Sequence, residues 1–297
     1  MGQDSADSVS VTWLREHLGE PGLLVVDSSV EFVAEDGEFT LTPGRAAYRD
    51  AHIPGAVFAD LLTDFADPSS DQPCTAPSSP RFAAAAGAIG IGDGVRVVVY
   101  DQRDGIWATR FWWQLRLEGF DDVAVLDGGL PAWQAAGAEI SDSPTAPAPT
   151  TFTTRRRSAL LRSTDEVLTA IGDDNTVLVA VLDPATYRGD TSPFPRPGHI
   201  PGSINLPIDQ IRNPATGTLR PVEELRSLFA DVGLLDPTIT PVTYCGGGVA
   251  ATGVAHALAL AGRDDVAVYD GSLTAWTADP ALPLVLGEPP HADHPHP

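Results

Sequence analysis

Short runs of consecutive apolar residues alternate along the chain with longer segments in which apolar residues recur at helical spacing. Residues 23–27, 95–101 and 123–129 are continuous, rich in β-branched residues and end in Asp or Gly, as buried strands do. Residues 109–119 and 252–263 have helical spacing and a glycine at or near their ends. Because continuous apolar strands alternating with helices are typical of a buried parallel sheet, we predict an α/β fold.

The chain contains one long internal repeat. Three motifs of the first half recur in the same order in the second half, at offsets between 143 and 147 residues. They are HIPG (52–55 and 199–202), the strand-like run that ends at Asp101 with its counterpart that ends at Cys245, and GGLPAW (128–133) with GSLTAW (271–276). A fourth match aligns the run at Asp27 with the run at Asp183. Such periodicity predicts two copies of one domain.

A segment rich in Pro, Ser and Thr separates the two copies. Residues 141–154 read SDSPTAPAPTTFTT, which predicts an extended linker. Three arginines (155–157) follow, and we interpret them as a solvated turn or as a docking contact between the domains. We therefore divide the chain into a first domain (1–140), a linker (141–157) and a second domain (158–297). The histidine-containing tail from Gly287 is expected to be disordered and not to form a metal site.

Composition excludes several classes of function. The net charge of −22 argues against nucleic-acid binding, because such a field repels phosphate backbones. All 18 basic residues are arginine, so neither a Schiff-base lysine nor a P-loop lysine can exist. No apolar run reaches the length of about 18 residues that a membrane helix needs. The polar, acidic N-terminus does not resemble a secretion signal, so a cytoplasmic protein is expected.

The strongest candidate for chemistry is Cys245. It follows a predicted strand and precedes Gly246, Gly247 and Gly248, after which a helix is predicted. Glycines let the backbone curl so that amide groups can face the sulfur, and the helix adds the positive end of its dipole. Such a turn favours a thiolate or a persulfide anion. The alternative is a small buried residue without chemistry. Cys74 lies in a Pro/Ser-rich loop with no helix behind it, so no catalytic role is expected of it.

Asp101 stands at the position of Cys245 in the first copy, so that copy cannot perform thiol chemistry. In open parallel sheets, sites form at the carboxyl ends of the strands. One active and one inactive copy would leave a single site, which we expect at the seam between the domains.

Together these motifs resemble the rhodanese family, specifically its tandem two-domain members. The resemblance spans residues 9–285 and includes both HIPG motifs, Trp112-Trp113, LDGGLPAW (126–133) and the loop 245–250. It implies two rhodanese-like domains, each a mainly parallel five-stranded sheet flanked by helices. It also implies a sulfurtransferase that takes sulfane sulfur from a donor, holds it as a persulfide on Cys245 and passes it to a thiophilic acceptor. Such enzymes need no organic cofactor and no metal.

Within the family, an Arg- and Lys-containing loop accompanies thiosulfate, and an uncharged Cys-Gly-Ser-Gly-Val loop accompanies 3-mercaptopyruvate. The substrate-binding loop here is uncharged, so the resemblance favours 3-mercaptopyruvate over thiosulfate; its residues are Cys245, Gly246, Gly247, Gly248, Val249 and Ala250. Gly247 replaces the serine thought to assist proton transfer, and Ala250 replaces the usual Thr or Ser. These departures bear on the donor and not on the persulfide chemistry.

The resemblance implies further site residues. Arg188 and Arg196 match the pair that holds the pyruvate carboxylate, for which a planar guanidinium is suited; two solvated surface arginines are the alternative. His52 matches the first-copy histidine that faces the cysteine, where it can orient the donor or transfer protons. A structural role like that expected of its twin His199 is the alternative. The implied partners are a small-molecule sulfur donor and a cyanide or thiol acceptor, with a thioredoxin-like reductant as a further candidate.

Three other functions compete with this one. A Cys-dependent phosphatase needs an arginine that closes the cysteine loop, and none occurs between Cys245 and Arg263. A catalytically silent binding or sensor protein would fit the first copy but not the cysteine loop of the second. A Cys-based hydrolase needs a nearby base, and His256 lies about three helical turns beyond Cys245.

Overall fold

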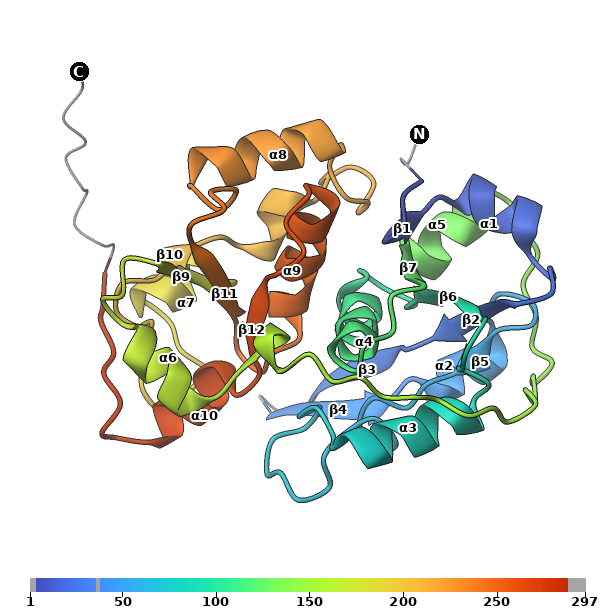
Figure 1. The fold of residues 1–297 in the computed structure, drawn as a ribbon, viewed down its shortest axis with the longest axis horizontal. Helices are drawn as coiled ribbons and strands as arrows, with labels where there is room; N and C mark the ends of the chain where they lie inside the picture. The colour runs from blue at the N-terminus through green and yellow to red at the C-terminus, as the bar shows by residue number, and fades with distance from the viewer. Residues whose placement is uncertain (1–3, 36–37, 288–297) are drawn as a thin grey trace.

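The computed structural model describes residues 4–35 and 38–287 and shows two α/β domains side by side (Figure 1). The three histidines of the tail lie outside the described residues. Across the described ranges, no helix is long and apolar enough to cross a membrane.

Each domain is built on one five-stranded sheet in which every neighbouring pair is parallel. The first sheet has the order β1 (Ser8–Val9), β7 (Val123–Leu126), β6 (Arg96–Tyr100), β2 (Leu23–Asp27) and β5 (Val57–Phe58). The second has the order β8 (Leu161–Arg162), β12 (Ala267–Tyr269), β11 (Thr240–Tyr244), β9 (Thr176–Ala180) and β10 (Ile204–Asn205). The two sheets match strand for strand, which confirms the predicted fold class and the predicted duplication.

One detail of the predicted repeat is wrong. β2 ends at Asp27, which pairs with Tyr100, whereas β9 ends at Ala180, which pairs with Tyr244. The counterpart of Asp27 is therefore Ala180, and Asp183 lies three residues beyond the strand. Asp183 instead caps the next helix, where its carboxylate accepts the amide of Ala185 at 3.1 Å. Two similar strings of apolar residues ending in Asp produced the wrong alignment.

Helices cover both sheets. In the first domain they are α1 (Val11–His17), α2 (Arg45–Asp50), α3 (Ser79–Ala88), α4 (Ile106–Leu117) and α5 (Gly129–Ala135). In the second domain they are α6 (Thr164–Ala170), α7 (Pro184–Arg188), α8 (Val222–Asp231), α9 (Ala250–Leu260) and α10 (Ser272–Ala278), with 3₁₀ turns at Ser158–Leu160 and Ile208–Ile211. The first domain also carries an antiparallel hairpin, β3 (Val30–Glu35) and β4 (Glu38–Pro43), that has no counterpart among the described strands of the second.

The domains meet through α4 and α9, the helices that follow the Asp101 loop and the Cys245 loop (Figure 1). Thr109 of α4 and Thr252 of α9 meet at this contact, where their hydroxyl oxygens lie 3.2 Å apart. Buried side chains of both domains form one continuous apolar core across this contact. Because each helix begins where its loop ends, packing the two helices together brings both loops to the same seam.

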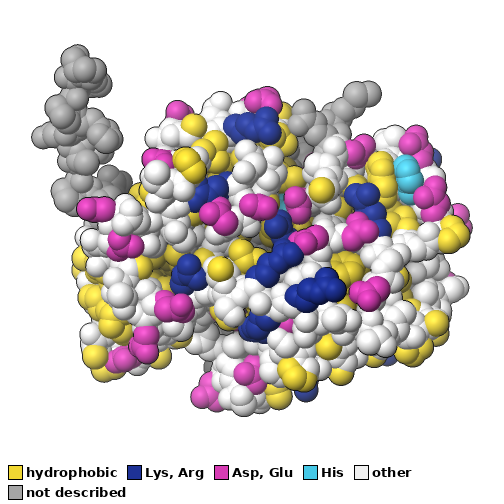
Figure 2. Space-filling view, viewed as in Figure 1, with side chains coloured by type: hydrophobic (Ala, Val, Ile, Leu, Met, Phe, Trp, Pro, Cys, Tyr) yellow, Lys and Arg dark blue, Asp and Glu magenta, His cyan; other side chains and the backbone are white. Residues whose placement is uncertain are grey.

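The linker is extended but packed along the first domain. The amide of Thr150 donates to Gly87 at 2.9 Å, the amide of Arg155 donates to Glu118 at 2.7 Å, and Phe152 is buried. Arg157 pairs with Asp121 at 2.5 Å, so its charge docks the linker on the first domain. Figure 2 shows basic side chains gathered across the middle of this face and acidic ones spread over both halves.

Candidate active site

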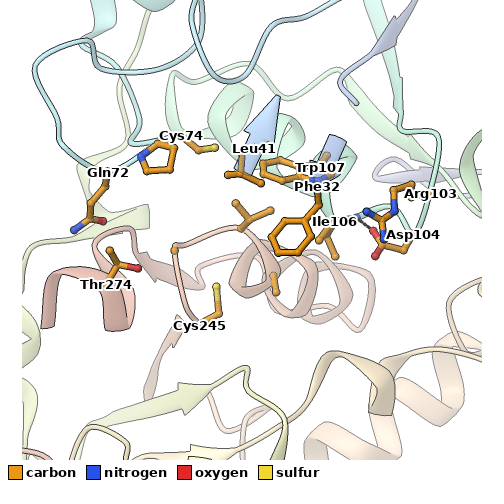
Figure 3. A pocket seen from close by; sticks show the side chains of 14 residues that line it. Phe32, Leu41, Gln72, Cys74, Arg103, Asp104, Ile106, Trp107, Cys245 and Thr274 are labelled. Atoms are coloured by element: carbon orange, nitrogen blue, oxygen red, sulfur yellow. Dashed lines mark hydrogen bonds between the residues drawn. The ribbon is translucent and has the colours of Figure 1, made fainter. Parts of the chain in front are cut away.

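A cavity of about 350 Å³ lies at the seam and is lined from both domains (Figure 3). The second domain contributes Cys245, Gly247, Val249, Ala250 and Thr274. The first domain contributes Phe32, Leu41, Gln72, Pro73, Cys74, Arg103, Asp104, Ile106 and Trp107. Cys245 therefore reaches a cavity whose other wall belongs to the first domain.

The position of Cys245 follows from the local fold. The buried strand β11 ends at Tyr244, and α9 begins at Ala250, so the loop crosses the carboxyl edge of the sheet. Gly248 has φ of 76°, and a Cβ there would lie 2.7 Å from the carbonyl oxygen of Asp270. Only glycine suits both the left-handed backbone and this close approach.

The other side of the cysteine loop is tied to the start of α10. The amide of Cys245 donates to the Ser272 hydroxyl at 3.1 Å. The carbonyl of Gly246 accepts from the Thr274 amide at 2.9 Å and from its hydroxyl at 2.8 Å. These bonds explain why the recurring GSLTAW motif accompanies the cysteine loop, since its first residues hold that loop in place.

The equivalent loop of the first domain shows how this turn surrounds an acceptor group with backbone amides. The Asp101 carboxylate accepts the amides of Arg103 and Gly105 on Oδ1, both at 2.9 Å. It accepts those of Trp107 and Ala108 on Oδ2, at 3.0 and 3.1 Å. Burial raises the pKa of the Asp101 carboxyl, and the amide hydrogen bonds oppose that rise. The strand–loop–helix turn thus directs four backbone amides at one buried side chain.

The cysteine loop lacks the corresponding hydrogen bonds. No described residue donates to Sγ of Cys245, which is only 4% exposed. A neutral thiol is a weak acceptor, whereas a carboxylate is a strong one, so the two loops differ in the strength of their central acceptor. The predicted amide bonds to the sulfur therefore stay a prediction for the ionised or sulfur-loaded cysteine.

Arg110 locks the cysteine loop against the first domain. Its fully buried guanidinium pairs with Asp270 at 2.6 Å and donates to the carbonyls of Gly248 at 3.0 Å and Cys74 at 2.5 Å. It also lies 4.6 Å from the ring centroid of Trp113. The sequence reading did not select this residue, although an arginine among the aromatic and aliphatic residues of a buried helix is a signal of a buried ion pair.

His52 does not line the cavity. Its Nδ1 lies 2.6 Å from the carbonyl oxygen of Tyr48, and its Nε2 lies 3.1 Å from that of Ser143. The twin His199 has the same arrangement, with Nδ1 2.8 Å from the carbonyl oxygen of Tyr187 and the ring stacked on that tyrosine. These contacts favour a structural role for His52, in which its ring holds neighbouring backbone segments. A catalytic role of His52 stays a prediction, and these contacts do not favour it.

Arg188 and Arg196 flank a loop that packs beside the cysteine loop, where a Cβ on Gly246 would meet the Phe194 ring at 3.0 Å. Neither arginine lines the cavity. Arg188 is partly exposed and pairs with Asp190 at 2.8 Å. Arg196 donates to four carbonyls at and beyond the end of α10: Trp276, Thr277, Asp279 and Leu282. Binding of a donor carboxylate by either residue stays a prediction, and the contacts favour Arg188.

The two arginines should respond differently to removal. Arg196→Ala should lower the free energy of unfolding by about 1–3 kcal/mol, because four carbonyls lose a charged donor. Arg188→Ala should leave that free energy nearly unchanged, because an exposed ion pair contributes little. If Arg188 binds the donor, its variant should instead raise KM for an anionic donor severalfold. Urea denaturation and steady-state kinetics on both variants separate these effects; an unchanged KM in Arg188→Ala would remove that residue from the site.

His256 is held away from the cysteine. Its ring is buried, its Nε2 lies 2.8 Å from the carbonyl oxygen of Asp7, and it meets Trp112 edge-on at 4.8 Å. Burial lowers the pKa of the imidazole. Since His256 does not line the cavity of Cys245, it cannot serve as the base that a Cys-based hydrolase requires.

Comparisons with known proteins agree with this geometry. The model of the rhodanese-like domain matches residues 10–136 and 163–279. Thiosulfate/3-mercaptopyruvate sulfurtransferase 1, mitochondrial, from Arabidopsis thaliana is 35% identical over 303 residues, covering 93% of this chain and 77% of that protein. The 3-mercaptopyruvate sulfurtransferase of Homo sapiens is 34% identical over 281 residues, covering 90% and 91%.

Solved structures agree as well. SseA from Escherichia coli, described with the 3-mercaptopyruvate sulfotransferases, superposes with a TM-score of 0.79 at 27% identity and covers 90% of this chain and 99% of that one. EanB in complex with ergothioneine superposes with a TM-score of 0.81, covers 98% of this chain and 73% of that one, and at 24% identity shares the fold alone. The duplicated sheets, the cysteine loop at their seam and these matches together establish that the chain belongs to the rhodanese family as a two-domain sulfurtransferase.

Proposed function

We propose that the protein moves sulfane sulfur from 3-mercaptopyruvate or thiosulfate to cyanide or a thiol through a persulfide on Cys245. The observation that carries the proposal is that Cys245 lines a cavity at the carboxyl edge of its sheet, on the turn whose twin holds a buried carboxylate. A thioredoxin-like reductant is a candidate physiological acceptor, and a cytoplasmic location remains the expectation from the sequence.

The reaction has two balanced steps. The Cys245 thiolate attacks the outer sulfur of the donor and forms an S–S bond. The donor's bond to that sulfur breaks, and sulfite leaves, or the pyruvate enolate leaves and takes a proton. An acceptor nucleophile then attacks the terminal sulfur of the persulfide, and Cys245 departs as a thiolate. Amides of the loop and the start of α9 would stabilise both sulfur anions.

Persulfide formation tests this proposal directly. The protein is treated with each donor separately, freed of small molecules, alkylated and digested, and the added sulfur is located by mass spectrometry. We expect it on the Cys245 peptide and expect cyanide to release it as thiocyanate. A protein that takes up no sulfur from either donor would contradict the proposal and leave a silent binding protein as the explanation.

Gly247 offers a test of the donor. A Cβ at this position meets nothing within 4 Å, and its backbone is outside the left-handed region, so a side chain fits. Gly247→Ser restores the serine of the 3-mercaptopyruvate loop at the cavity wall. We expect kcat/KM to rise severalfold for 3-mercaptopyruvate and to change little for thiosulfate. Gly247→Ala is the matched control without a hydroxyl; equal effects of both variants would show that the hydroxyl has no role.

A further inference from the structure

The hairpin β3–β4 adds an apolar wall to the cavity. Phe32 and Leu41 stand directly opposite each other in the register of the two strands. Opposite residues in an antiparallel pair project to the same face and lie close together. Both side chains line the cavity that contains Cys245, and Figure 3 shows them on the side opposite to its sulfur. The second domain has no such hairpin among its described strands. The hairpin of the first domain therefore covers the Cys245 loop, and the Asp101 loop has no corresponding cover from a hairpin of the described part of the second domain.

The lining has a clear division. The middle, which faces Cys245, is apolar and includes Phe32, Leu41, Ile106 and Trp107. Polar side chains lie at its two ends, with Gln72 and Thr274 at one and Arg103 and Asp104 at the other (Figure 3). Phe32 is 48% exposed. A partly exposed aromatic ring beside a nucleophile marks a place where an apolar body can be bound.

The donors of the proposed reaction do not account for this wall. Thiosulfate and 3-mercaptopyruvate are small, hydrophilic anions with almost no apolar surface. The cavity of about 350 Å³ has room for roughly ten water-sized groups, at about 30 Å³ each. Binding of either donor would bury almost no apolar surface against the middle of the cavity. An aromatic or alkyl group bound there would remove both its own apolar surface and that of the cavity wall from water, which is favourable.

We propose that Phe32 and Leu41 select the sulfur acceptor, and that the preferred acceptor is a thiol on a neutral, apolar, ring-sized body. This inference rests on the proposed function, since the acceptor must meet a persulfide on Cys245. The bound thiol, as its thiolate, attacks the terminal sulfur; the S–S bond to Cys245 breaks, Cys245 leaves as a thiolate, and the acceptor departs as a persulfide. Phe32 and Leu41 hold the body of the acceptor and take no part in bond making.

A single-turnover experiment separates the two steps. The enzyme is loaded with sulfur from 3-mercaptopyruvate or thiosulfate, and loading is followed by release of pyruvate or sulfite. The loaded enzyme is then discharged with benzyl mercaptan or with 2-mercaptoethanol, two thiols of similar acidity that differ in their apolar body. We expect benzyl mercaptan to discharge wild type at least roughly tenfold faster, as the burial of several apolar carbons permits.

Phe32→Ser should lower this ratio of discharge rates severalfold or more. Leu168→Ser is the matched control, because Leu168 is also exposed, at 41%, but lies on α6 and does not line the cavity; its ratio should equal that of wild type. The inference would be overturned by a wild-type ratio near one, or by a ratio that Phe32→Ser leaves unchanged. If the enzyme still loaded sulfur normally in that case, the proposed function would stand. Failure of wild type to load sulfur would overturn both.

Discussion

Cys245→Ser should lower sulfur transfer to cyanide by about 1000-fold or more, because a hydroxyl cannot form a persulfide and removal of a covalent nucleophile has effects of that order. The substitution is nearly isosteric, and the contacts that hold the loop are made by the backbone of Cys245, whose amide donates to Ser272. The variant should therefore fold normally. Thiocyanate production with each donor, measured beside thermal unfolding, checks both expectations.

Cys74→Ala is the matched control. Cys74 is also buried and also lines the cavity, but Arg110 uses only its backbone carbonyl. Burial raises the pKa of the Cys74 thiol to about 12, so it stays protonated and unreactive at neutral pH. The control should keep its rate within a fewfold of wild type. Persulfide found on Cys74, or substantial transfer by Cys245→Ser, would mean that the nucleophile has been assigned wrongly.

Arg110→Leu should destabilise the protein by about 3–5 kcal/mol, which is the effect of removing one partner of a buried ion pair. The change would leave the Asp270 carboxylate buried without its cation and would leave the carbonyls of Gly248 and Cys74 without their donor. Because these groups belong to both domains, the seam should loosen with the loop. Urea denaturation measures the loss in the free energy of unfolding. Sulfur transfer by the variant should be lower than that of wild type even at urea concentrations at which both proteins are still folded.

Arg226→Leu is the corresponding surface control. Its guanidinium pairs with Glu223 at 2.6 Å, yet the arginine side chain is 47% exposed. Such pairs contribute at most about 1 kcal/mol, so the unfolding midpoint should barely move. If the two leucine variants unfolded at similar denaturant concentrations, Arg110 would not hold the seam as its contacts indicate.

Much of the architecture could be predicted because it depends on local patterns. The runs ending at Asp27 and Asp101 are strands because continuous β-branched residues suit a sheet covered on both faces. The cysteine turn was predictable because consecutive glycines allow the tight turn and positive φ that other residues avoid, and the structure confirms a left-handed residue at Gly248. The repeat then indicated two sheets and a seam, since equivalent loops lie at equivalent edges.

The rest of the site depends on contacts between distant segments. Nothing near Arg110 in the sequence identifies Asp270 as its partner, because the two meet only after the domains pack. The hairpin carried a local signal, alternating residues on both sides of an Asp-Gly pair, but its position over the other domain's cysteine did not follow from that signal. The roles inferred for His52 and Arg196 came from matched motifs, which record spacing along the chain and not the direction of a side chain.

The two halves of the chain contribute different parts of the seam cavity. The nucleophile and its turn come from the second half of the chain, whereas nine of the residues around it come from the first. Substitutions that change reactivity and substitutions that change the fit of a substrate therefore fall in different domains. A library confined to the Phe32 and Leu41 strands could vary the shape of the cavity while the Cys245 loop stayed unchanged, so selectivity could be redesigned in the first domain alone.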